Sequence, residues 1–158
     1  MSLPDGLTIR RASTEDLETI VGHRRAMFRD MGYSDEVTLD SMAARFRVWL
    51  RKHMDAGDYL AWVVTATDGE VAAGAGLWLM DWPSHMLGKG GPRGNILNVY
   101  TADKFRRLGL ARELMEAVVQ WCRENGVEVV ILHASPAGRS LYESLGFKAT
   151  NEMRINLV

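Results

Sequence analysis

The sequence has one cysteine and four prolines among its 158 residues. A single cysteine cannot form an internal disulfide. Apolar runs such as residues 129–132 are far shorter than the roughly 20 residues needed to cross a bilayer. The first residues lack the basic start and apolar run of a secretory signal. We therefore expect a cytoplasmic protein that binds no membrane.

The charge is nearly balanced, with 19 basic and 20 acidic residues and a formal net charge of -1. Such a chain has no overall field to attract nucleic acid, so we predict no nucleic-acid partner, and any anion site must come from locally clustered cations. The composition, 47% hydrophobic and 25% charged, is typical of a globular protein. The length suits one domain, so we predict a single domain over residues 1–158.

The hydrophobic pattern and the turn signals predict one order of helices and strands. Ser13 and Asp16 form a capping-box signal, and Asp68-Gly69 is a hairpin signal. A strand-helix-strand unit implies parallel strands, so we predict an α/β fold with a mixed (α+β) sheet. The predicted strands are residues 7–10, 59–66, 71–80, 95–100 and 129–134, with a last strand or pair in 147–157, and the predicted helices are residues 13–31, 38–56, 109–125 and 138–145.

The segment from Asp81 to Gly94 contains Trp82-Pro83 and four glycines. This composition predicts a long loop, and long loops inside compact domains are often functional. We expect it to contact the substrate.

A basic turn precedes the predicted helix at 109–125. The turn and the first residues of the helix contain four cations, Lys104, Arg106, Arg107 and Arg112. Between residues 103 and 112 the sequence has only one acid, Asp103. The free amides of a helix start and the helix dipole favour an anion, and glycine at position 109 allows close approach. The alternative is an ordinary helix start with a solvated basic face, but cations there oppose the dipole at a cost of a few tenths of a kcal/mol each.

Two motifs in this half of the chain resemble one family. Arg106-Arg107-Leu108-Gly109-Leu110-Ala111 fits the R/Q-x-x-G-x-G/A pattern of the GCN5-related N-acetyltransferases (GNAT superfamily). Leu141-Tyr142-Glu143-Ser144-Leu145-Gly146-Phe147 is similar to the family's "lYeklGF" ending. Asp103 departs from a common proline, and Ser135 stands where many members have asparagine.

The resemblance implies the GNAT acyl-CoA N-acyltransferase fold, a central twisted mixed sheet with helices on both faces. It implies acetyl-CoA (coenzyme A) as cosubstrate and no metal. The pyrophosphate would bind around Gly109, the pantetheine would lie along the strand before the turn, and a main-chain amide near Val99 would polarise the thioester carbonyl. The implied cofactor contacts are Leu97, Asn98, Val99, Tyr100, Arg106, Arg107, Leu108, Gly109, Leu110, Ala111, Arg112, Ser135, Gly138 and Arg139.

The resemblance also implies transfer of the acetyl group to a primary amine of a small molecule or peptide. Tyr142 would be the general acid for the departing thiolate, or would only pack beneath the sulfur. Asp81, His85, His133 or an ordered water could take the amine proton, although we expect His133 to be structural on a buried strand.

Further expectations concern the cysteine, the alternative functions and the oligomeric state. The spacing of Cys122 predicts a buried structural thiol rather than a nucleophile. The alternative function is an acyl-CoA-binding sensor without turnover, on the same fold, and a phosphosugar or nucleotide binder is a third possibility. Members of the family often form homodimers.

Overall fold

The order of elements follows the pattern expected from the sequence as far as the last helix. The computed structural model describes residues 2–158. The strands are β1 (Leu7–Arg11), β2 (Tyr59–Ala66), β3 (Val71–Met80), β4 (Arg93–Thr101) and β5 (Val130–Leu132), the helices are α1 (Leu17–Asp30), α2 (Glu36–Ala56), α3 (Leu110–Glu124) and α4 (Arg139–Ser144), and two short 3-10 turns are η1 (Thr14–Asp16) and η2 (Asp103–Phe105).

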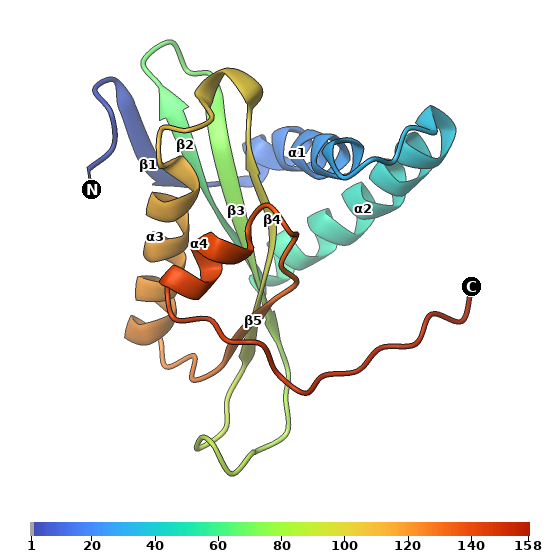
Figure 1. Cartoon of the computed structure of the whole chain (residues 1–158), viewed down its shortest axis with the longest axis vertical. Coiled ribbons are helices and arrows are strands. Elements are labelled where there is room, and N and C mark those ends of the chain that lie inside the picture. The colour runs from blue at the N-terminus through green and yellow to red at the C-terminus, as the bar shows by residue number, and fades with distance from the viewer. Residues whose placement is uncertain (1) are drawn as a thin grey trace.

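The strands form one sheet in the order β1-β2-β3-β4-β5 (Figure 1). The first four strands pair antiparallel, and β4 pairs parallel with β5. The antiparallel hairpin and the parallel strand-helix-strand unit were both expected, because a tight Asp-Gly turn reverses the chain and a helical crossover does not.

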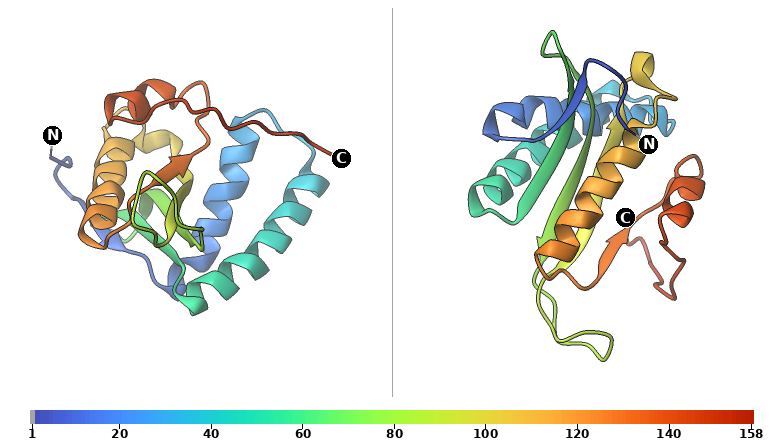
Figure 2. Two further views of the ribbon diagram at one scale, coloured as in Figure 1. Left: turned by 90° about the horizontal axis from the view of Figure 1, so that it is seen from below. Right: turned by 90° about the vertical axis from the view of Figure 1, so that its left-hand side faces the viewer.

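The helices cover both faces of the sheet. α1 and α2 lie on one face, and α3 and α4 lie on the other (Figures 1 and 2). Each face has its own apolar core: Val64 and Leu77 pack with Leu114 of α3, whereas Ile20 of α1 packs with Leu50 of α2. The mixed α/β architecture predicted from the sequence is confirmed.

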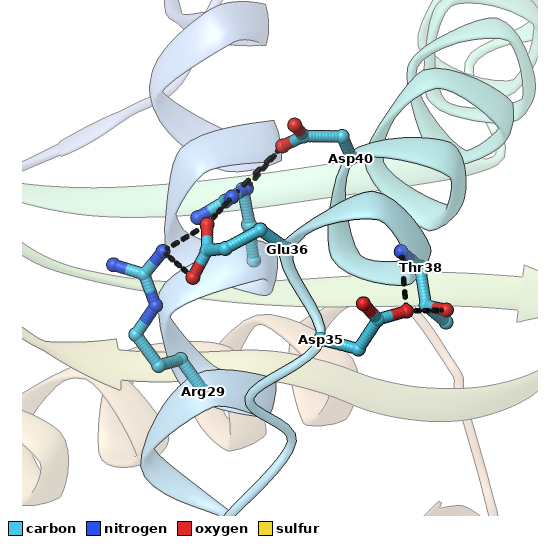
Figure 3. Close-up of polar contacts among 6 residues, drawn as sticks. Arg29, Asp35, Glu36, Thr38 and Asp40 are labelled. Carbon is cyan, nitrogen blue, oxygen red and sulfur yellow. Dashed lines mark hydrogen bonds and ion pairs between the residues drawn. The ribbon is translucent and has the colours of Figure 1, made fainter.

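Local polar contacts fix the start of η1, which leads into α1, and the start of α2. The Ser13 hydroxyl accepts a hydrogen bond from the Glu15 amide, and the Asp16 carboxylate accepts one from the Ser13 amide over 2.8 Å, which completes the capping box. The Asp35 carboxylate caps α2 by accepting a hydrogen bond from the Thr38 amide (Figure 3). These contacts satisfy amides that have no partner inside a helix.

The predicted last strand is absent, and several boundaries differ from the sequence prediction, including the earlier starts of α2 at Glu36 and of β4 at Arg93. β5 ends at Leu132 rather than residue 134, and residues 148–158 contain no strand. This segment has the alternation of a strand, with Met153, Ile155 and Leu157 at every second position, but all three side chains are exposed. A strand is defined by its pairing, and no strand in residues 2–158 pairs with this segment.

Within residues 2–158, no helix has the length and apolarity to span a membrane.

Candidate functional site

Strands β4 and β5 separate partway along the sheet. They pair only at Gly94, Asn95 and Ile96 of β4. From Leu97 onward β4 keeps β3 on one side, and no strand within residues 2–158 lies on the other. A free strand edge presents unpaired N-H and C=O groups, which can accept an extended ligand as if it were another strand.

A β-bulge lies at the start of this free edge. The register between β3 and β4 shifts between Gly74 and Gly76, and Asn98 adopts the left-handed conformation with φ of 57°. Its side chain is buried, donating from Nδ2 to the Tyr59 hydroxyl over 2.9 Å and accepting at Oδ1 from Arg24 over 2.8 Å. Bulges bend a strand and re-aim its polar groups. Because the Asn98 side chain is engaged behind the sheet, only its main chain faces the free edge.

The basic turn follows β4 and ends at the start of α3. Arg107 and Gly109 both have left-handed backbone, with φ of 63° and 78°. Helical bonding begins at Arg112, whose amide donates to the Gly109 carbonyl over 3.0 Å. No side chain caps α3, and a Cβ built on Gly109 would meet no atom within 4 Å in the described chain. The turn therefore combines free amides with open space, which suits a phosphate group.

The cations of the turn are less free than the sequence suggested. Lys104 pairs with Glu70, Arg106 pairs with both Asp30 and Asp103, and Arg112 lies 3.7 Å from Glu116. Arg107 alone among these cations has no carboxylate partner within residues 2–158. Acids distant in sequence thus offset most of the predicted local excess of positive charge, and the main-chain amides are the principal anion-binding groups of the turn.

Helix α4 brings Tyr142 toward the same region. Its ring packs at the edge of the core cluster that also receives Val99, and its centroid lies 6.2 Å from that of Phe147. A Cβ on Gly138 would lie only 2.9 Å from the Tyr142 ring, so glycine there makes room for it. Burial raises the pKa of the Tyr142 hydroxyl above its usual value, which keeps the phenol protonated.

The Ser135 and Arg139 side chains form hydrogen bonds with neighbouring residues at the start of α4. The Ser135 hydroxyl accepts a hydrogen bond from the Gly138 amide over 3.2 Å, and the Arg139 guanidinium donates to Glu143 over 2.8 Å. Both side chains therefore have local partners. A contact of either with a cofactor stays a prediction.

The candidate proton acceptors are not brought together. Asp81 and His85 are exposed in the loop before β4, next to the part of β4 that pairs with β5, and this loop projects away from the start of α3 (Figure 1). His133 is exposed rather than buried, because β5 stops one residue before it, and its Nε2 lies 3.8 Å from Glu152. The expectation of a buried structural histidine was wrong.

Cys122 is 1% exposed within the core. Burial raises its pKa to about 11, so the thiol is not ionised at neutral pH. The prediction of a buried structural thiol is confirmed.

Sequence reasoning missed a polar cluster behind the bulge. Arg24 and His23 on α1 meet Asn98 and Tyr59 there. Burial lowers the His23 pKa to about 4 and raises the Tyr59 pKa to about 12. Arg24 stands four residues after Ile20 and four before Phe28, and this helical spacing along an apolar stripe is the sequence signal that it turns inward.

Comparisons with known proteins agree on one family. Residues 18–147 match the model of the acetyltransferase (GNAT) family. A GCN5-related N-acetyltransferase from Ralstonia eutropha is 35% identical, with 96% of this chain and 99% of that chain covered and a TM-score of 0.89. No curated protein matches the sequence.

Two more distant structures share the fold. A predicted acetyltransferase from Clostridium acetobutylicum, solved with acetyl-CoA, is 24% identical with a TM-score of 0.85, and covers 96% of each chain. Glucosamine-6-phosphate N-acetyltransferase from Arabidopsis thaliana is 22% identical with a TM-score of 0.64, over 96% of this chain and 99% of that one.

Proposed function

This chain belongs to the acetyltransferase (GNAT) family and is an acetyl-CoA-dependent N-acetyltransferase; from that premise we propose that it acetylates a primary amine of a small molecule or peptide by direct attack. The observation that carries the proposal is the free edge of β4 leading into the uncapped turn at Gly109. One continuous surface thus offers strand-like main-chain partners followed by anion-binding amides.

The residues of this surface fit coenzyme A in chemical type. The amides of residues 107–111 and the Arg107 side chain would hold the pyrophosphate. Residues 97–100 would hold the pantetheine through their main chain, as an added strand does. An amide near Val99, beside the bulge, would stabilise the oxyanion, a contact whose loss elsewhere costs about 3 kcal/mol. When bound, acetyl-CoA supplies the activated acetyl group.

The acceptor amine must first lose a proton. For a lysine-like amine, supplying the neutral form at pH 7 costs roughly 4.6 kcal/mol. Of the three candidate bases, the geometry favours His133, because it directly follows β5 at the point where β4 and β5 have separated. Its exposed ring would accept the amine proton and pass it to water. The amine nitrogen then bonds to the acetyl carbon, and the carbon-sulfur bond breaks.

Tyr142 is the proposed general acid for the departing thiolate. With ordinary pKa values near 10 and 8.5, transfer from a phenol to the thiolate is uphill by about 2 kcal/mol, and the raised pKa of Tyr142 adds to that cost. Burial keeps the Tyr142 proton in place before that step. Tyr142 and Val99 pack against the same core cluster, which supports a position of the hydroxyl on this side of the sheet.

The proposal is tested by incubating the protein with acetyl-CoA and a panel of amines. Thiol release above the rate without protein, together with an acetylated amine identified by mass spectrometry, is the expected result. Acetyl-CoA binding without thiol release from any amine would favour the alternative, a sensor of acyl-CoA. Equal stabilisation by CoA and by unrelated diphosphates would favour a nucleotide or phosphosugar binder.

We also propose that residues 1–158 form a single acetyltransferase domain, since both apolar cores adjoin one sheet. A homodimer stays a prediction from the family resemblance.

A further inference from the structure

Arg24 is a half-buried cation without an acid. Its Nη1 donates to the Asn98 side-chain oxygen over 2.8 Å, and no carboxylate lies within ion-pair distance in residues 2–158. Its Nε is buried with no hydrogen-bond partner in the same residues. A buried guanidinium with unused donors is costly, because a charge removed from water needs both a counter-charge and hydrogen bonds.

The neighbouring cations of α1 show the contrast. Arg25 lies 2.8 Å from Asp40 and also pairs with Glu36, and Arg29 lies 2.7 Å from Glu36 (Figure 3). Their charges are therefore satisfied between α1 and α2. Arg24 turns to the sheet instead, where it meets only neutral groups.

The surroundings of Arg24 are built to hold a flat cation. Its guanidinium carbon lies 5.1 Å from the Phe28 ring centre and 4.7 Å from that of Phe46. Aromatic faces attract a cation but do not neutralise its charge. The two titratable groups beside it, His23 and Tyr59, are uncharged at neutral pH. The site therefore retains one unbalanced positive charge and unused N-H groups.

Arg24 also stands next to the proposed reaction centre. It contacts the residue that forms the bulge, one position before Val99. The centre of the neighbouring His23 ring lies 5.0 Å from that of the Tyr100 ring, so α1 meets β4 beyond the part that pairs with β5. A ligand group meeting Arg24 would thus lie on the α1 side of the opening, a short distance from an acetyl group held at Val99.

We propose that Arg24 binds a carboxylate of the acceptor, so that the preferred acceptors are amines that also carry a carboxylate, such as amino acids. This inference rests on the proposed function. A single planar guanidinium matches the geometry of one carboxylate. A doubly charged phosphate would need a second free cation, and Arg25 and Arg106 are already paired.

The test compares acceptors that differ only in this charge. Free amino acids and their carboxamides are assayed with acetyl-CoA at equal concentrations of neutral amine. The wild type should favour the free acids by about 10- to 100-fold in kcat/KM, the range for hydrogen bonds to a charged group. Arg24→Gln should remove most of that preference while the carboxamides lose much less.

Asn98→Asp is the matched second variant. It leaves Arg24 in place but supplies an internal carboxylate of the same size, which should compete with the acceptor and remove the preference for free acids. Arg24→Lys keeps the charge without the planar fork and should retain part of the preference. Equal losses for both acceptor types in Arg24→Gln would assign Arg24 to supporting the bulge and would overturn the proposal.

Two other outcomes separate this inference from the proposed function. Acetylation of amines with no preference for the carboxylate would overturn the inference alone. Absence of acetylation with every amine would overturn the proposed function and this inference together. A preference for phosphate-bearing amines over amino acids would also contradict it.

Discussion

The Asn98 amide donates a hydrogen bond to the Tyr59 hydroxyl over 2.9 Å, joining the bulge of β4 to strand β2 across the intervening β3. Gly76 lies between them, and a Cβ there would come within 2.0 Å of that hydroxyl. The bulge is therefore supported by a buried contact between residues 39 positions apart in the sequence.

Tyr59→Phe should lower the free energy of unfolding by about 1–3 kcal/mol, because it leaves the buried Asn98 amide without an acceptor. Urea denaturation measures the change. Tyr33→Phe, at a tyrosine that is 58% exposed, is the control and should change stability by less than about 0.5 kcal/mol. Equal stability of Tyr59→Phe and the wild type would mean that the hydrogen bond contributes nothing to the fold.

Gly109→Asp should weaken CoA binding by about tenfold or more, since it places bulk and negative charge beside the proposed phosphate amides. Gly126→Asp is the matched control, because Gly126 has a similar left-handed φ of 71° just beyond the other end of α3. Both variants carry backbone strain, but Gly126→Asp should bind CoA as the wild type does. Calorimetric titration separates them, and unchanged affinity in folded Gly109→Asp would contradict the site.

Tyr142→Phe should lower kcat by about 100-fold while the affinity for acetyl-CoA changes little, because general acid catalysis acts on the leaving thiolate. Since burial raises the Tyr142 pKa, kcat should not fall between pH 7 and about 9 through loss of this proton. Steady-state kinetics and binding measured side by side provide the check. Unchanged turnover would mean that Tyr142 only packs in the core and is not the general acid.

Stability should decrease on acidification through His23. Its pKa falls from 6.5 to about 4 on folding because burial disfavours the charged ring. Between these values the unfolded chain binds a proton that the folded protein does not, so stability is full above pH 6.5 and is lost towards pH 4, by about 3 kcal/mol.

The variant His23→Gln should have a flatter dependence of unfolding free energy on pH across this window. Asp16 contributes mainly below this window, because the hydrogen bond from Arg10 lowers its pKa from an ordinary value of 3.8. Denaturation curves at several pH values test the prediction, and the same slope in both proteins would exclude His23 as the source.

Features set by neighbouring residues could be predicted from the sequence. The Ser13–Asp16 capping box and the Asp68-Gly69 turn form within four residues, so their geometry depends little on the rest of the chain. The same holds for the glycine turn before α3, whose motif also carried the family resemblance. Helical and strand periodicity then determined which faces are apolar, and hence the two layers of helices.

Features that need distant partners were decided by the tertiary structure. The acids that neutralise the basic turn come from distant parts of the chain: Glu70 from the turn between β2 and β3, and Asp30 from the end of α1. Arg24 meets Asn98 across 74 positions, and His133 is exposed because β5 ends before it. The apolar alternation after residue 148 finds no partner strand in the described chain. Pairing of charges and strands depends on distances in space, which local sequence pattern does not specify.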